Sequence, residues 1–313
     1  MIVYEQSDFQ IKENTAVTIG NFDGIHLGHQ KLIGTVLDFS KNYNLKSVMF
    51  SFNPHPVAFF DRKKDFKTMF SVDEKKFIAQ RTGVDVLVQY PFDAEFASMD
   101  PKEFIDLLID KTNCRVLVVG ENYCFGKDRV GNIDILKHLG NENGIHVIGI
   151  PRVKVKDVRV SSTRIRGLIN YGDMEKVTYL LQKPYFAMGE VVRGDQRGRL
   201  MNFPTINLCL SGDKLLPPDG VYFSTVIIDG KEYYGMSNIG MNPTFNGDFR
   251  KIETNIFDFD QDVYGKTAIV TFYKRIRAER KFDDMQSLKA QMIADKQSIQ
   301  ECIKDKELLK YKL

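Results

Sequence analysis

The pattern of apolar residues changes near the middle of the chain, and this change is the strongest constraint on the fold. Before Lys183-Pro184, short apolar runs alternate with helical patterns, whereas after it strand patterns follow one another with turn residues between them. The first pattern favours a doubly wound parallel sheet and the second a small antiparallel barrel. The chain has 313 residues, enough for two domains. We therefore predict an α/β domain at residues 1–183 and a β domain at residues 184–313.

In the first domain, ligands are expected beyond the carboxyl ends of the parallel strands. The loops after Gly20, Phe52 and Gly120 should meet there. The expected strands are Thr15–Gly20, Ser47–Phe52, Val84–Tyr90, Arg115–Gly120 and His146–Ile150, and the expected helices are Leu27–Tyr43, Pro101–Lys111, Ser161–Asn170 and Asp173–Leu181.

The second domain reads as strands joined by turns such as Asp229-Gly230, followed by an amphipathic helix over Met285–Lys310. The expected strands are Phe186–Arg193, Thr205–Cys209, Val221–Asp229, Glu232–Asn238 and Lys266–Phe272.

Composition limits the binding partners and the cellular compartment that we expect for this chain. A formal net charge of +3 gives no argument for nucleic-acid binding. No apolar run approaches the roughly 18 residues that span a bilayer, so no membrane partner is expected. The four cysteines form no CxxC, which argues against a zinc knuckle and a disulfide framework and favours a reducing cytoplasm. Cys114 lies in an apolar run and is expected to be a core thiol.

The segment Gly20-Asn21-Phe22-Asp23-Gly24-Ile25-His26-Leu27-Gly28-His29 runs from an expected strand into an expected helix. Histidines three positions apart share one face of a helical turn, and imidazoles can donate to phosphate oxygens. The helix N-terminus adds positive potential, and glycines let a nucleotide approach the backbone. This suits the α-phosphate of ATP. Two lone histidines would more simply be surface residues; a metal site is disfavoured because no HExxH or suitably spaced third ligand accompanies them.

A second polar segment is Ser161-Ser162-Thr163-Arg164-Ile165-Arg166. Its hydroxyl residues can cap the following helix, and its arginines can clamp phosphates through bidentate contacts. A capping segment with solvated arginines is the simpler alternative for this segment taken alone.

In the second half, a loop rich in glycine and arginine precedes Phe203-Pro204-Thr205-Ile206-Asn207-Leu208. No GxxxxGK[ST] is present, so an ATP site here needs other phosphate donors, such as Arg193 and Arg197. Thr205 and Asn207 lie on one face of the strand and offer oxygen ligands suited to Mg²⁺ bound with ATP. Glu253 could take a proton from an alcohol, although an exposed glutamate on a barrel strand is the simpler reading.

These motifs, in order through the whole chain, resemble the prokaryotic bifunctional riboflavin kinase/FMN adenylyltransferase family, also called FAD synthetase. The stretch Gly198–Asn207 is similar to its GRxxGxPTxN signature, and His26–His29 resembles the HxGH signature of nucleotidyltransferases. The other matching segments of the first half are Gly20–His29, Ser51-Phe52-Asn53-Pro54-His55-Pro56, Val119-Gly120-Glu121-Asn122-Tyr123-Cys124-Phe125-Gly126 and Ser161–Arg166. Those of the second half are Asp219-Gly220-Val221-Tyr222, Ser237–Phe245 and Glu253–Gly265.

The resemblance implies a Rossmann-like module that joins FMN to the AMP part of ATP and releases pyrophosphate. In that module His26 and His29 would contact the ATP phosphates, and Asn122 would help to hold the nucleotide or its transferred phosphate. The leaving pyrophosphate would bind Ser161, Ser162, Thr163 and Arg164, with Arg166 nearby. Pro54, His55 and Pro56 would shape the flavin pocket, or simply form a rigid loop.

The resemblance also implies a kinase barrel that phosphorylates riboflavin. There Thr205 and Asn207 would bind Mg²⁺ and ATP, with Arg193 and Gly198 at the phosphates, and Glu253 would be the base. Arg277 and Phe282 match a segment near the flavin, although a solvated charge run is an equal alternative. Two residues depart from the family: Asn202 stands where glycine is usual, and Asn255 where histidine is common and could tune Glu253.

The expected partners are thus riboflavin, FMN, FAD, ATP, ADP and pyrophosphate, with self-association possible in addition. Three other hypotheses remain. The chain could keep only one activity, the adenylyltransferase first. It could be a nucleotidyltransferase for a pantetheine or a nucleotide monophosphate, which the Pro204–Asn207 barrel motif disfavours. It could be a non-catalytic flavin- or RNA-binding regulator, which the intact site residues and near-neutral charge disfavour.

Overall fold

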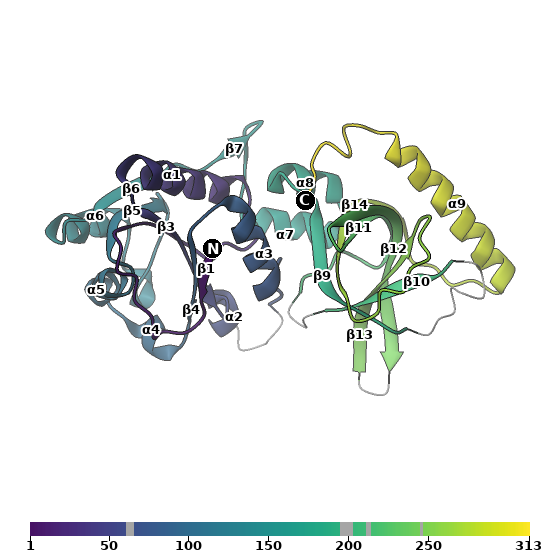
Figure 1. The fold of residues 1–313 in the computed structure, drawn as a ribbon, viewed down its shortest axis with the longest axis horizontal. Helices are drawn as coiled ribbons and strands as arrows, with labels where there is room; N and C mark the ends of the chain where they lie inside the picture. Colours follow the sequence, from purple (N-terminus) through teal and green to yellow (C-terminus); the bar gives the residue numbers. More distant parts are fainter. Residues whose placement is uncertain (61–65, 195–202, 211–213, 245–246) are drawn as a thin grey trace. The chain divides into compact units, whose positions relative to one another are not determined.

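The computed structural model describes residues 1–60, 66–194, 203–210, 214–244 and 247–313 (Figure 1). The chain forms two compact units, Met1–Ser161 and Ser162–Leu313. Helices α7 (Ser162–Tyr171) and α8 (Met174–Leu181) thus fall in the second unit, and α8 packs against barrel strands β9 and β14. A domain boundary after Lys183 stays a prediction.

The first unit contains the predicted parallel sheet. Its six strands run in the order β1-β4-β3-β2-β5-β6, and all neighbouring pairs are parallel. Helices connect them, so the α/β prediction is confirmed. The strands are β1 (Ile2–Tyr4), β2 (Thr15–Ile19), β3 (Lys46–Asn53), β4 (Val86–Pro91), β5 (Cys114–Gly120) and β6 (His146–Ile150).

Alternate residues of each strand point to opposite faces of this sheet, and apolar side chains pack on both faces. On one face, Ala16 and Val118 pack against Leu32 and Val36 of α1 (Leu27–Tyr43). On the other face, Val17 and Ile19 belong to a larger core that includes residues of α5 (Pro101–Thr112) and α6 (Ile133–Glu142). Cys114 lies in this second core, as predicted, and burial raises the pKa of its thiol.

Some elements of the first unit were not predicted. Strand β1 pairs with β4 and forms the edge of the sheet, and helix α3 (Val72–Thr82) begins with a capping box between Ser71 and Glu74. That Ser-x-x-Glu spacing was a readable signal for a helix start. The remaining short elements are α2 (Pro56–Phe60), α4 (Ala94–Ser98), the 3₁₀ turn Lys127–Arg129, and the hairpin of β7 (Lys154–Val155) and β8 (Val158–Arg159).

The second unit contains the predicted antiparallel barrel. Six strands close in the order β10-β13-β12-β11-β14-β9, and their pairs are antiparallel. The predicted hairpin turn at Asp229-Gly230 joins β11 to β12. The strands are β9 (Tyr185–Val192), β10 (Thr205–Cys209), β11 (Gly220–Ile228), β12 (Lys231–Thr244), β13 (Gly247–Ile256) and β14 (Thr267–Ala278).

Helix α9 (Met285–Ile303) lies along the barrel (Figure 1). Its Ile299 packs with Val221, Phe223 and Tyr273, residues that alternate with the barrel-interior positions of their strands. The helix ends earlier than the predicted Lys310, because Asp305 accepts the amides of Glu307 and Leu308 and so favours a turn.

Gly189 of β9 lies close to the backbone of the neighbouring strand β10. A Cβ atom built there would lie 2.1 Å from the carbonyl oxygen of Cys209 on β10. We expect Gly189→Ala to force these strands apart and to lower the free energy of unfolding by about 1–3 kcal/mol. Gly34→Ala is the matched control, because its Cβ would meet nothing within 4 Å in helix α1 and alanine favours the helix. Urea unfolding followed by circular dichroism would show the contrast; equal midpoints for both variants would contradict it.

Candidate functional site

The carboxyl end of β2 is the topological centre of the first unit. Strand β2 pairs with β3 on one side and with β5 on the other, so the strand order reverses there. In open α/β sheets this reversal opens a crevice between neighbouring loops. The loops after β2, β3 and β5 therefore leave adjacent strands at the same edge, as predicted from Gly20, Phe52 and Gly120.

Two histidines follow β2 and lie against each other. Their ring centroids are 3.8 Å apart with an interplanar angle of 10°, and Phe22 lies 5.1 Å from the ring of His29. His26 is the N-cap of α1, where its Nδ1 accepts the backbone N–H of His29 at 3.3 Å. A neutral His26 consequently carries its proton on Nε2, which makes Nε2 a donor. The predicted shared face of the pair is confirmed.

The β2–α1 loop (residues 20–26) that carries His26 has an unusual backbone. Phe22, Gly24 and Ile25 all have positive φ values, of 47°, 102° and 44°. Such conformations persist only where surrounding contacts enforce them. Asp23 is buried and accepts the amide of Met69 at 2.8 Å, and Gln30 donates to the Ile25 carbonyl at 3.1 Å.

The loops after β3 and β5 place the other predicted residues of this unit. Asn122 is exposed, and its Oδ1 would lie 3.5 Å from a Cβ built on Gly120, so it stays close to the end of β5. After β3, Pro54, His55 and Pro56 lead into α2. The ring of His55 stacks on Phe66 at 4.7 Å, and its Nδ1 accepts the amide of Val57 at 3.1 Å.

An exposed aromatic cluster beside Pro54–Pro56 was missed by the sequence analysis. Phe59 and Phe60 are 37% and 64% exposed, and both rings lie edge-on to Phe92, with centroids 5.4 and 5.8 Å away. Their helix α2 begins at Pro56. Large exposed aromatic side chains commonly mark ligand or protein contacts. The adjacent Phe59-Phe60 pair was the signal in the sequence.

The predicted phosphate clamp, Ser161–Arg166, lies at the start of α7. Thr163 and Arg164 are exposed, and Ser161, Ser162 and Arg166 are half-buried. The helix N-terminus adds positive potential at this point. Ser161 ends the first unit and the other members begin the second, so these residues and His26–His29 belong to different compact units.

Three predicted kinase residues lie together on two paired barrel strands. Asn207 of β10 stands directly opposite Glu253 of β13, and Thr205 stands opposite Asn255. Asn207 is 6% exposed, and its Oδ1 is buried with no hydrogen-bond partner among the described residues. Asn255 donates from Nδ2 to the Pro204 carbonyl at 2.8 Å and so fixes the residue before Thr205.

Gly194 lies immediately beside Asn207. A Cβ built on Gly194 would approach the Asn207 Nδ2 to 2.2 Å, so a larger residue at position 194 would displace the Asn207 side chain. Arg193 is exposed and lies over the ring of Tyr264 at 5.4 Å. The predicted phosphate donors Arg197 and Gly198, and the departure at Asn202, lie outside the described residues.

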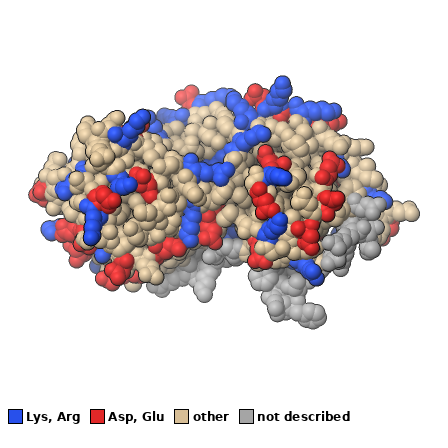
Figure 2. All heavy atoms as spheres, viewed as in Figure 1, with Lys and Arg blue, Asp and Glu red and all other residues tan. Residues whose placement is uncertain are grey.

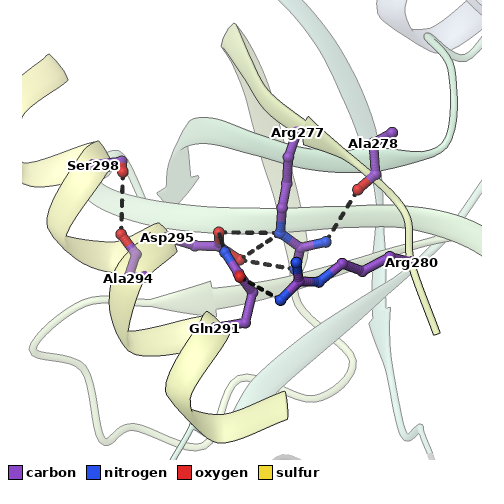
Figure 3. A network of polar contacts seen from close by, with 7 residues as sticks. All are labelled: Arg277, Ala278, Arg280, Gln291, Ala294, Asp295 and Ser298. Carbon is purple, nitrogen blue, oxygen red and sulfur yellow. Dashed lines mark hydrogen bonds and ion pairs between the residues drawn. The ribbon is translucent and has the colours of Figure 1, made fainter. Parts of the chain in front are cut away.

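Arg277 is the penultimate residue of β14, and Figure 3 shows it facing Asp295 of α9. Phe282 lies between these two elements in the sequence. The Arg277 guanidinium bonds both oxygens of Asp295, with its Nε 2.9 and 3.0 Å away and its Nη2 2.8 Å from Oδ2. Gln291 donates to Asp295 at 2.7 Å and accepts from Arg280, whose guanidinium lies 4.6 Å from the Phe282 ring centroid. Arg277 is thus a structural anchor of α9, and a flavin contact stays a prediction.

Surface charge (Figure 2) and potential metal ligands indicate no further functional site among the described residues. Basic and acidic side chains are interspersed on the face drawn in Figure 2. No group of three or more His, Cys, Asp or Glu that could hold a metal ion occurs among the described residues. Within the same ranges, no helix combines the length and apolar character that crossing a bilayer requires.

Comparison with known proteins identifies both units. Residues 8–164 match the family model for FAD synthetase, and residues 181–303 match that for riboflavin kinase. The two matches therefore define a chain with an FAD synthetase part and a riboflavin kinase part. The chain belongs to the bifunctional riboflavin kinase/FMN adenylyltransferase family.

Individual relatives span nearly the whole chain. The bifunctional riboflavin kinase/FMN adenylyltransferase of Bacillus subtilis (strain 168) is 37% identical over 92% of this chain and 93% of its own length. The protein of the same name from Escherichia coli (strain K12) is 32% identical over 93% of each chain. A crystal structure described as a macrolide-efflux protein from Streptococcus pneumoniae is 34% identical, with a TM-score of 0.85 over 96% of this chain and 99% of that one.

The Arg277–Asp295 pair provides a stability test. The Asp295 side chain is 3% exposed and that of Arg277 20%, so removing the carboxylate leaves a largely buried guanidinium without its partner. We expect Asp295→Ala to lower the free energy of unfolding by about 2 kcal/mol or more. Lys102→Ala, which breaks an exposed ion pair with Asp106, should leave the urea midpoint unchanged. A wild-type midpoint for Asp295→Ala would show that Arg277 does not anchor α9.

Proposed function

We propose that this chain performs both family reactions. It phosphorylates riboflavin with ATP to give FMN, and it joins FMN to the AMP part of ATP to give FAD and pyrophosphate. The observation that carries the proposal is that one chain contains both family matches, FAD synthetase at residues 8–164 and riboflavin kinase at residues 181–303. The substrates and products are riboflavin, FMN, FAD, ATP, ADP and pyrophosphate; a cytoplasmic location and self-association stay predictions.

Adenylyl transfer is assigned to the first unit and the α7 segment. A phosphate oxygen of FMN attacks the α-phosphorus of ATP, and the bond to pyrophosphate breaks. Stabilising charge on the phosphates is the main catalytic requirement, since no covalent intermediate is needed. His26 can donate from Nε2 beside the N-terminus of α1, and His29 stacks on it. Asn122 would hold the nucleotide, while Ser161–Arg166 would bind the leaving pyrophosphate.

The flavin of this reaction is assigned to the loop after β3. Pro54, His55 and Pro56 would line one side, and the exposed rings of Phe59 and Phe60 offer apolar surface for a planar isoalloxazine. Aromatic rings gain from offset stacking and edge contacts with such a system. The His55–Phe66 stack holds the imidazole of His55 in place.

Riboflavin phosphorylation is assigned to the barrel. Glu253 would accept the proton of the ribityl 5′-hydroxyl as its oxygen attacks the γ-phosphorus of ATP and ADP leaves. Its place opposite Asn207 brings this carboxylate beside the predicted nucleotide strand. Arg193, near the end of β9, would meet the phosphates. Arg277 and Phe282 are proposed as flavin neighbours only because they match a segment of the family that lies near the flavin.

Mg²⁺ is the metal that the barrel residues fit. The buried Asn207 Oδ1 has no partner in the described part of the chain, and a hard cation would satisfy it. The hydroxyl of Thr205 lies on the same strand face. When bound, the metal would neutralise phosphate charge; the protein's part is to hold these two oxygens and Glu253 in register.

Two variants test the division of labour. His29→Ala should lower FAD formation from FMN by about 100-fold or more, because a phosphate donor is lost, and leave FMN formation from riboflavin intact. Glu253→Ala should lower FMN formation by about 100-fold or more and spare adenylylation of added FMN. Chromatography of both flavin products gives the rates. Loss of both activities in either folded variant would refute the two-site model, and FAD made only from added FMN by the wild type would support the single-activity alternative.

The metal assignment has its own test. Asn207→Ala should raise the Mg²⁺ concentration needed for half-maximal FMN formation about tenfold or more, because an oxygen ligand is lost. Cys209→Ala is the control, since Cys209 is an exposed residue of the same strand. Initial rates across a Mg²⁺ titration give the result, and identical titrations for the two variants would rule out Asn207 as a ligand.

A further inference from the structure

A buried lysine lies beneath the β2–α1 loop. Lys75 of α3 is 7% exposed, and its Nζ donates to the Asn21 carbonyl at 3.1 Å and to Ser51 Oγ at 3.0 Å. Ser51, which is fully buried on β3, donates its own hydroxyl to the same carbonyl at 3.1 Å. Two side chains from different elements thus hold one carbonyl of the loop that carries His26.

Burying this ammonium is unfavourable. Desolvation lowers the pKa of Lys75 from 10.5 to about 8, and the nearby carboxylate of Asp23 opposes this shift. The loop, α1 and α3 also contain His26, His29 and Glu74, respectively, and Glu74 accepts the amide of Ser71. An apolar side chain would fill the same position without the desolvation cost, so stability alone does not favour a lysine there.

The hydrogen bonds of Lys75 fix the direction of one peptide group. The Asn21–Phe22 peptide is trans, so its carbonyl and the N–H of Phe22 point in opposite directions. With the carbonyl held toward Lys75, the N–H is directed to the other side of the loop. Among the described residues this N–H donates to no protein acceptor. Backbone N–H groups before a helix N-terminus are typical phosphate donors.

We propose that Lys75 is a positioning residue for adenylyl transfer: it holds the Asn21–Phe22 peptide in the orientation that serves the ATP phosphates, and it supplies positive charge beneath the loop. The proposal rests on the adenylyltransferase function assigned to the first unit. It assigns Lys75 no contact with substrate. The bound carbonyl immediately precedes Phe22, the first positive-φ residue of the loop.

Lys75→Met separates this role from simple packing. Methionine keeps most of the volume and removes the ammonium, so the melting temperature at neutral pH should not fall. FAD formation from FMN should drop roughly 100-fold, as expected when reacting groups are misplaced. FMN formation from riboflavin is the internal control, since Lys75 lies outside the kinase unit. Lys76→Met is the matched variant, because Lys76 lies next to Lys75 on α3 and forms its ion pairs with Glu5 and Asp73; it should keep both activities.

The pH dependence gives a readout that packing would not change. Because the pKa of Lys75 is lowered to about 8, its ammonium is present below that pH and lost above it. FAD formation by the wild type should therefore decline as the pH rises through about 8. Lys75→Arg stays charged and should restore activity relative to Lys75→Met, with no such decline up to about pH 9.5.

Each outcome decides the proposal. If the wild type forms FAD and Lys75→Met loses less than about threefold, the ammonium does not position the loop. The same conclusion follows if the alkaline decline persists unchanged in Lys75→Met or Lys75→Arg. Should the variants not fold, the ATP affinity of the wild type is measured across pH instead. An ATP affinity that does not change as the pH rises through about 8 would overturn the proposal. If the wild type forms no FAD from FMN, the adenylyltransferase assignment itself fails.

Discussion

The parallel pairing of β2 between β3 and β5 is the constraint on which the first unit depends. It reverses the strand order, so three loops leave adjacent strands at one edge of the sheet. Helix α1 on one face and the larger core on the other bury all five residues of β2. The stacked pair of His26 and His29 can then be placed by a short, strained loop because both ends of that loop are fixed, by β2 before it and α1 after it.

Much of this could be predicted because it depends on local pattern. The alternation of strands and helices, the change to consecutive strands after Lys183-Pro184 and the spacing of His26 and His29 are all visible in neighbouring residues. Local pattern does not predict that Asn207 lies opposite Glu253, since this depends on which barrel strands pair. Only the family resemblance indicated that these two residues belong to one site.

The rest depends on contacts between distant parts of the chain. Lys75 follows Asn21 by 54 positions, and as one lysine of an ordinary helix it carries no signal of burial or of a target. Strand β1 is three residues long and gains its stability from β4. The ion pair between Arg277 and Asp295 anchors α9, and no motif spacing in the sequence indicates this pairing. Pairing partners of this kind are set by tertiary structure rather than by local preference.

In each unit, a side chain from another element holds the carbonyl group that precedes a predicted site residue. In the sheet unit, Lys75 and Ser51 hold the carbonyl of Asn21, one residue before Phe22. In the barrel, Asn255 donates to the carbonyl of Pro204, one residue before Thr205. Because a peptide group is planar, fixing a carbonyl also fixes the N–H of the next residue. Asn255, which departs from a common histidine, therefore acts on the predicted metal strand itself, and its substitution need not alter Glu253 to affect the kinase site.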